Sequence, residues 1–241
     1  MKLWITRSEP GASRQAAELT AAGYPCWVRS VLTIEPLSPA LPKGAFERCI
    51  FVSEHGVHCG LPRLQAAAPG LILPAAVHCL AIGPRTASAL SAHGIASASN
   101  AARSDSEALL ADPRLRDVKD LRVLLVAGVG GRTLIEDTLR ARGASVERFE
   151  CYRRVSRLDP LPRDAAVGVT AIIVGSGEAL LPIRTLWREA DGSDDVLVLV
   201  PSSRVAGRAV ELGFGNVHDC GAADVSAVLR ALREVKDAGS E

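Results

Sequence analysis

The stretch LAIGPRTASALSAHGI, residues 80–95, reads as a short strand that runs directly into a helix through Gly83. Thr86 lies at the junction, and Gly94 stands where a left-handed residue commonly ends a helix. The N–H groups at such a helix start favour an anion. The turn has neither the lysine of a phosphate loop nor the third glycine of a dinucleotide-binding turn. The residues of this turn therefore do not identify its ligand.

The same unit recurs along the chain, as a strand, a turn of Gly, Ser, Thr or Arg, and an amphipathic helix. Further copies include LWITRSEPG (3–11), CIFVSEHGV (49–57), RVLLVAGVGGRT (122–133), AIIVGSGEA (171–179) and VLVLVPSSRVAG (196–207). Strands that are apolar on both faces are typical of a parallel sheet covered by helices on each side. The pattern predicts an α/β protein with about ten strands, which suits two doubly wound sheets of about five strands better than one sheet.

Two extended, proline-punctuated segments, 31–44 and 151–164, read as connections between lobes. If both cross, residues 1–36 and 156–241 together form one discontinuous lobe, and residues 37–155 form an inserted lobe. The sequence thus predicts two lobes in which the first is completed by the last third of the chain.

The composition excludes several classes of protein. The 241 residues carry 28 Lys and Arg against 27 Asp and Glu, so no overall field draws in nucleic acid or an anionic membrane. The apolar stretch before Arg7 is too short for a signal peptide, which predicts a cytoplasmic protein. The six cysteines form no C-x-x-C pair and read as reduced, structural thiols. No set of ligands points to a metal.

In an open parallel sheet a ligand lies beyond the carboxyl ends of the strands. That rule selects hydroxyl groups, glycine turns and arginines as candidate binding residues: Arg7, Ser53, Gly83, Thr86, Gly128, Arg132, Ser176 and Ser202. Four of them, Ser53, Thr86, Ser176 and Ser202, fit helix N-caps equally well. Several helix starts together suit a ligand with several negative groups.

Taken in order, several motifs resemble the uroporphyrinogen-III synthase family. They are WITRSEP, IFVSEHGV, LAIGPRTASAL, DSEALL, VLLVAGVGGRTLIEDTLRARGASVERFECY, IIVGSGEAL and VPSSRVAGRAVELGF. The resemblance covers nearly the whole chain and lies in the order and spacing of the motifs. It implies two α/β lobes joined by a two-stranded ladder, with the substrate held in a cleft between them.

The resemblance also implies a reaction. The family's substrate is hydroxymethylbilane, a linear tetrapyrrole with eight carboxylates, and the product is uroporphyrinogen III, formed without a cofactor. By motif position it implies that Ser53, Gly83, Thr86, Ser176, Ser202, Arg204 and Val205 bind substrate. Tyr152, at the return crossing, is the candidate catalytic group, and a structural tyrosine packed against the ladder is the alternative. We expect a monomer that contacts the preceding pathway enzyme transiently at most.

Two other functions stay open on the sequence alone. One is a two-lobed binding protein for a multiply anionic small molecule, with no chemistry. The other is a nucleotide-dependent transferase that reads phosphate through the GVGGRT turn at 128–133, although Arg132 and Thr133 stand where the third glycine should come.

Overall fold

The computed structural model describes residues 1–67, 79–99 and 105–238. Contacts between residues divide the chain into two units, each described here by itself. Unit 1 consists of Met1–Thr33 and Val155–Glu241, and unit 2 of Ile34–Arg154. The chain therefore leaves unit 1, builds unit 2 and returns. That the two units are separate domains, bounded as the sequence suggests at residues 36 and 155, stays a prediction.

Unit 1 contains a five-stranded sheet in the order β11-β10-β9-β1-β2, and every pair is parallel. The strands are β1 (Lys2–Ile5), β2 (Cys26–Val28), β9 (Val169–Ile173), β10 (Leu197–Val200) and β11 (Asn216–Asp219). The helices are α1 (Gly11–Ala21), α6 (Arg163–Ala166), η3 (Gly177–Ala179), α7 (Leu180–Glu189), α8 (Ser203–Glu211) and α9 (Val225–Ala238).

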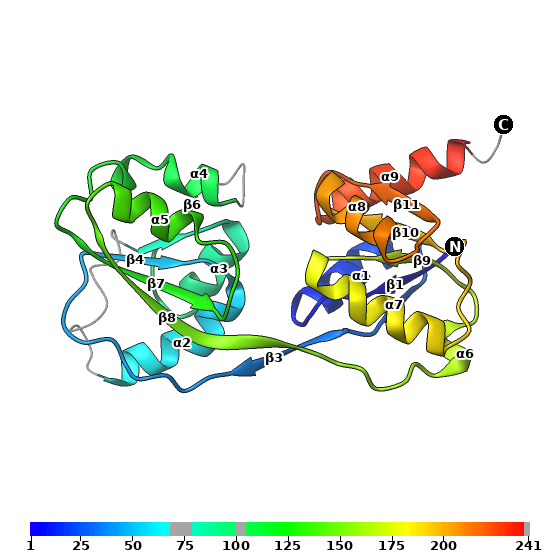
Figure 1. Ribbon diagram of the computed structural model, residues 1–241, viewed down its shortest axis with the longest axis horizontal. Helices are drawn as coiled ribbons and strands as arrows, with labels where there is room; N and C mark the ends of the chain where they lie inside the picture. The colour runs from blue at the N-terminus through cyan, green and yellow to red at the C-terminus, as the bar shows by residue number, and fades with distance from the viewer. Residues whose placement is uncertain (68–78, 100–104, 239–241) are drawn as a thin grey trace. The chain divides into compact units, whose positions relative to one another are not determined.

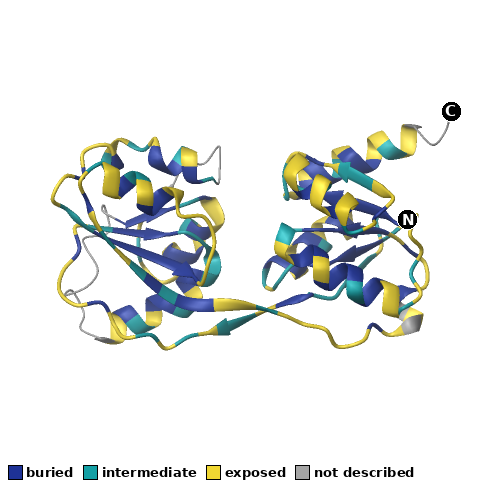
Figure 2. Ribbon diagram, in the orientation of Figure 1, coloured by how far each residue is buried: buried dark blue, intermediate teal, exposed yellow. Residues whose placement is uncertain are grey.

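Alternation along the strands of unit 1 supplies two cores, one on each face of the sheet. Trp4 of β1 joins the core that α7 and α8 cover, whereas Leu3 and Ile5 join the core that α1 and α9 cover. In Figure 1 the helices of this unit lie on both sides of its strands, and Figure 2 shows buried strands between helices whose outer faces are exposed. This is the doubly wound arrangement that the apolar strands predicted.

Unit 2 contains a six-stranded sheet in the order β3-β8-β7-β4-β5-β6. The strands are β3 (Leu32–Pro36), β4 (Arg48–Phe51), β5 (Cys79–Ala81), β6 (Ala98–Ser99), β7 (Arg122–Gly128) and β8 (Ser145–Ser156). The helices are α2 (Glu54–Ala67), α3 (Pro84–Ala92), α4 (Ser106–Leu110), η2 (Pro113–Leu115) and α5 (Leu134–Ala141). The pairs from β8 to β6 are parallel, so five parallel strands carry one further strand, β3, at the edge.

Strands β3 and β8 form the two-stranded extended ladder that was predicted. The N–H of Leu37 donates to the carbonyl of Cys151, and the N–H of Arg157 donates to the carbonyl of Val31, each at 2.8 Å. Residue numbers rise along one strand as they fall along the other, so this pair is antiparallel. The boundary between the two units falls within both strands of this ladder, after Thr33 in β3 and after Arg154 in β8.

One glycine in unit 1 gives a test of the packing. Gly192 lies against the indole of Trp187, which is 2% exposed and donates from Nε1 to the carbonyl of Ser193 at 2.8 Å. A Cβ at position 192 would overlap the indole ring. We expect Gly192→Ala to lower the free energy of unfolding by roughly 1–3 kcal/mol, as overpacking does. Urea denaturation followed by fluorescence measures it.

Gly207 is the matched control, since it is exposed in the middle of α8 and a Cβ there meets nothing within 4 Å. Gly207→Ala should raise the free energy of unfolding by roughly 0.5–1 kcal/mol, because alanine favours a helix over glycine. Equal effects of the two substitutions would contradict the packing described for Trp187.

Candidate active site

The site in unit 2 is built where β8 leaves regular pairing with β7. Ala127 pairs with Glu150 but Gly128 pairs with Tyr152, so β8 holds one extra residue, Cys151. Such a bulge breaks the alternation of side chains. Cys151 and Tyr152 are consecutive, yet both are buried in the same core beside Phe149. The bulge therefore turns the phenol of Tyr152 into unit 2.

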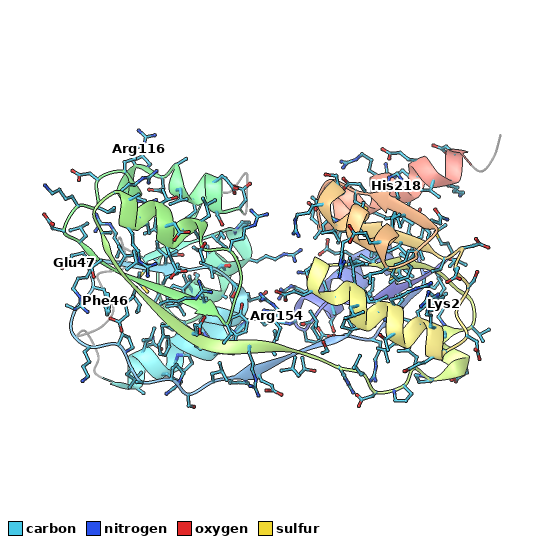
Figure 3. The ribbon with its side chains drawn as sticks, in the orientation of Figure 1. Lys2, Phe46, Glu47, Arg116, Arg154 and His218 are labelled. Atoms are coloured by element: carbon cyan, nitrogen blue, oxygen red, sulfur yellow. The ribbon has the colours of Figure 1, made fainter. Side chains whose placement is uncertain are left out.

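The hydroxyl of Tyr152 has two side-chain partners. Its Oη lies 2.9 Å from Ser53 Oγ and accepts from Arg154 Nη2 at 3.1 Å. The Arg154 guanidinium also lies over the phenol ring, 5.4 Å from its centroid, and Figure 3 labels this arginine on β8. Ser53 Oγ in addition accepts from the N–H of Gly56 at 2.9 Å, so it is the N-cap of α2 as well. A phenol, an alcohol and a guanidinium thus form one hydrogen-bonded group.

Gly128 is required by the ring of Tyr152. A Cβ on Gly128 would lie 2.6 Å from Cε2 of that ring, closer than side chains pack. The N–H of Val129 donates to the carbonyl of Tyr152 at 2.8 Å, which holds the loop after β7 to β8. The first glycine of the GVGG turn thus makes room for Tyr152.

Arg148 holds the glycine turn in place through hydrogen bonds to its carbonyl groups. Its Nη2 donates to the carbonyls of Gly128, at 2.8 Å, and of Gly130, and its Nη1 pairs with Glu136 at 2.7 Å. A phosphate-binding turn offers N–H groups to its ligand, whereas here two carbonyls of the turn face an arginine. This arrangement gives no support to nucleotide binding by GVGGRT.

A pocket of about 180 Å³ adjoins this turn. Its walls include three predicted residues, Gly128, Arg132 and Tyr152, together with Arg148 and Arg154. Arg132 is exposed and pairs with Glu107 at 3.6 Å. The pocket has positive charge on its walls and suits a carboxylate, because guanidinium groups bind one well.

Gly83 and Thr86 begin α3 in unit 2. Gly83 is the N-cap in extended conformation, no side chain caps this end, and Pro84 follows. Thr86 is 4% exposed inside the first turn. Thr86 is therefore not a helix N-cap, which was one of the two roles that the sequence allowed. Any ligand at this helix start meets backbone N–H groups.

In unit 1 the predicted residues meet at the carboxyl ends of β1, β9 and β10. Ser176 and Ser202 are N-caps of η3 and α8 with extended backbones, but neither side chain caps its helix. A Cβ on Gly177 would lie 3.8 Å from Val205 Cγ2, which brings these two helix starts together. The N–H groups of both starts are left without a side-chain cap.

Two arginines accompany these helix starts. Arg7 follows β1, and its Nε lies 2.8 Å from where a Cβ on Gly11 would be, so its side chain lies over the first residue of α1. Its own Cβ is 3.3 Å from the corresponding point at Gly175, just before Ser176. Arg204 is exposed in the first turn of α8. Unit 1 thus has its own set of groups suited to anions.

Burial raises the pKa of all six cysteine thiols. Burial is the main cause that raises the pKa of Cys151 to about 12, and burial likewise raises the pKa of Cys79 and of Cys220 to about 11. All six cysteines are free. Within the described ranges no cluster of His, Cys, Asp and Glu could hold a metal ion. Cys49, Cys79, Cys151 and Cys220 are buried like apolar groups, whereas Cys26 and Cys59 are half-buried.

Sequence reasoning missed Arg148 and Arg154. Both lie on β8, in ERFECYRR, where charges alternate with apolar residues, and such a strand reads as an ordinary edge with one solvated face. The bulge at Cys151 makes Arg154 a neighbour of the Tyr152 hydroxyl, and a bulge leaves no signal in residue types. The double arginine beside Tyr152 was the available hint.

Comparison with known proteins gives concordant results. The profile of the uroporphyrinogen-III synthase HemD family matches residues 13–228. A uroporphyrinogen-III synthase of Salmonella typhimurium is 33% identical over 248 residues, covering 97% of this chain and 100% of the relative. One of Escherichia coli is 31% identical over 251 residues, again covering 97% and 100%.

Solved structures agree on the fold. The uroporphyrinogen-III synthetase of Helicobacter pylori matches with a TM-score of 0.62 at 12% identity, over 97% of this chain and 98% of the other. A mutant uroporphyrinogen III synthase of Thermus thermophilus matches with a TM-score of 0.53 at 17% identity, over 97% and 99%. The match along the chain confirms the resemblance seen in the motifs, and this chain belongs to the uroporphyrinogen-III synthase family.

Proposed function

We propose that this chain catalyses the cyclisation of hydroxymethylbilane to uroporphyrinogen III, a step of tetrapyrrole biosynthesis. The family match along residues 13–228 carries this conclusion. The hydrogen-bonded Tyr152 beside an arginine-walled pocket supplies the chemistry. A cytoplasmic location, a monomer and transient contact with the preceding enzyme stay predictions, and no helix in the described ranges is long and apolar enough to span a bilayer.

The helix starts are the proposed carboxylate-binding groups. Those of α3, η3 and α8 have no side-chain cap, so no side-chain oxygen of the N-cap residue competes with an anion at these positive helix ends. Each helix start contributes roughly 0.3–1 kcal/mol toward a surface anion, so several together suit a substrate with many carboxylates. Gly83, Thr86, Ser176 and Ser202 would act here mainly through the backbone, and Arg7, Arg132 and Arg204 through charge. The N–H of Val205 donates to the carbonyl of Ser202 at 3.0 Å, so Val205 would contact the substrate through its side chain.

The pocket beside Tyr152 takes only part of the substrate. At about 180 Å³ it is smaller than the sites that bury whole drug-sized ligands, and a tetrapyrrole is larger still. One carboxylate arm or one pyrrole ring fits this volume, with Arg132 at the rim. The remaining rings would lie along the surface of the strand ends.

The reaction balances without a co-reactant. The terminal C–O bond breaks, and the hydroxyl leaves as water with one added proton, which gives an azafulvenium cation. The substituted carbon of the last pyrrole attacks to form a spiro intermediate, which fragments and closes with that ring inverted. The last pyrrole loses its α-proton as aromaticity returns, so one proton enters and one leaves. We assign the entering proton to the hydroxyl group of Tyr152.

Positioning is the larger part of the task. The pyrrole nitrogen expels the hydroxyl readily, so closure also occurs without an enzyme and then gives the unrearranged isomer. The protein has to hold the chain so that closure occurs at the hindered carbon. Backbone N–H groups at helix starts suit this role, because they are fixed by the fold.

The activity has a direct test. Hydroxymethylbilane generated in situ should give mainly the type III isomer when this protein is present, and the type I isomer in buffer alone. Chromatography of the oxidised products measures the ratio. Type I product alone, at the rate of the buffer control, would favour the binding-protein alternative instead.

Tyr152→Phe tests the proton donor. We expect kcat to fall about ten-fold, less than the 10²–10⁴-fold typical of general acids, because the leaving group departs readily. The product should stay mainly type III, since the groups that hold the carboxylates remain. Unchanged turnover across pH, with unchanged stability, would leave Tyr152 a purely structural role.

Arg204→Gln tests the binding role of unit 1, with Arg208→Gln as its control. Arg208 lies one turn later on α8 and pairs with Glu211 at 2.8 Å. Losing an exposed ionic contact worth roughly 0.5–1 kcal/mol should raise KM about two- to five-fold for Arg204→Gln and leave kcat unchanged. Steady-state kinetics of both variants decide it, and an equal change in the two KM values would remove Arg204 from the site.

A further inference from the structure

Among the described residues, the hydrogen bonds around Tyr152 leave one hydroxyl hydrogen without a partner. Tyr152 and Ser53 bring two hydroxyl hydrogens, and a single hydrogen bond of 2.9 Å joins their oxygens. Arg154 and the N–H of Gly56 are both donors, so they use lone pairs and accept nothing. One of the two hydroxyl groups therefore donates to the other, and the second hydrogen remains for a ligand.

Acidity decides which hydroxyl donates to which. A phenol is a stronger hydrogen-bond donor than an aliphatic alcohol, and an alcohol oxygen is the better acceptor, because the phenol oxygen shares its lone pairs with the ring. The stronger arrangement has Tyr152 donating to Ser53 Oγ. The hydrogen that remains is then that of Ser53.

Burial points in the same direction. Tyr152 is 1% exposed, whereas Ser53 is half-buried at the start of α2. Of the two residues, Ser53 is therefore the more exposed. The proton that Tyr152 supplies therefore has a route through Ser53.

Arg154 completes the group electrostatically. When the phenol gives up its proton, negative charge develops on Oη, which already accepts from the Arg154 guanidinium at 3.1 Å. A hydrogen bond between charged groups is about twice as strong as a neutral one, so the contact strengthens as the charge appears. Arg154 thus favours proton release and acts through Tyr152.

We propose that Ser53, Tyr152 and Arg154 form a proton relay, in which Ser53 meets the leaving hydroxyl. Ser53 Oγ–H gives its proton to the hydroxyl oxygen of the substrate as the C–O bond breaks and water forms. Tyr152 Oη–H replaces that proton on Ser53 Oγ, which leaves a phenolate facing Arg154. The α-proton lost by the last pyrrole later returns along the same route. The relay rests on the proposed function and adds to it.

Variants at positions 53 and 152 distinguish the relay from direct donation by Tyr152. Ser53→Ala, Tyr152→Phe and the double variant should all lower kcat by about the same ten-fold factor, because any break stops the same proton. Independent roles would instead multiply to about a hundred-fold loss. Ser53→Thr keeps a hydroxyl and an N-cap, so it should retain most of the kcat that Ser53→Ala loses.

Arg154 is tested in two backgrounds. Arg154→Gln should lower kcat in the wild-type chain and have no further effect beside Tyr152→Phe, since no phenol oxygen is left to stabilise. Arg153→Gln is the control on the same strand, where Arg153 pairs with Glu35 at 2.7 Å, and it should leave kcat unchanged. A structural role for Arg154 would give the same loss in both backgrounds.

The outcomes separate the relay from the proposed function. Wild-type protein that makes no type III product overturns both. If the wild-type protein makes type III product, any one of three results overturns the relay alone. These are a near-normal kcat for Ser53→Ala, a roughly hundred-fold loss in the double variant, or an equal effect of Arg154→Gln in both backgrounds. Circular dichroism of each variant shows that the chain is folded, and Ser53→Thr keeps the test valid if loss of the N-cap unfolds Ser53→Ala.

Discussion

The site of unit 2 depends on one constraint, the alternation of side chains along a strand. A regular β8 would send Cys151 and Tyr152 to opposite faces of the sheet. The register shift at Gly128 removes that alternation for one residue, so both side chains enter the same core. Everything that surrounds the phenol follows from this shift. Gly128 has to be a glycine because the ring lies against it, and Ser53 and Arg154 reach the hydroxyl because the ring points inward.

Much of the fold could be predicted because it is carried by local patterns. Apolar strands such as Val123–Val126, helix starts after glycine turns, and two proline-punctuated crossings indicated two parallel α/β lobes. The residues of β3 by themselves indicated only an extended crossing, the ladder was expected from the family resemblance, and β3 joins the sheet of unit 2 as an edge. Its pairing with β8 depends on partners about 120 residues away in sequence, and such pairing leaves little trace in local composition.

The candidate site was predicted as a set of positions, but not as a set of contacts. Ser53 was expected either to cap a helix or to bind a ligand, and the structure shows the cap together with a bond to Tyr152. Ser176 and Ser202 stand at N-cap positions as expected, yet their side chains make no capping bond. The difference lies in χ angles and in neighbours from distant strands, which residue types do not encode. Arg148 was missed for the same reason, because its four acceptors come together only in the folded unit.

The helix starts without side-chain caps have a consequence for how such a sequence can change. A carboxylate held by backbone N–H groups depends on where the helix begins and hardly at all on which side chains surround it. Substitutions of uncharged side chains near Gly83, Ser176 or Ser202 that keep the helix start would then be nearly neutral for ligand affinity. A protein built this way can drift far in sequence while its fold is retained, as the match to the Helicobacter pylori structure at 12% identity illustrates. The residues of single turns in such a protein are poor markers of family membership. The order of the turns along the chain is a better marker.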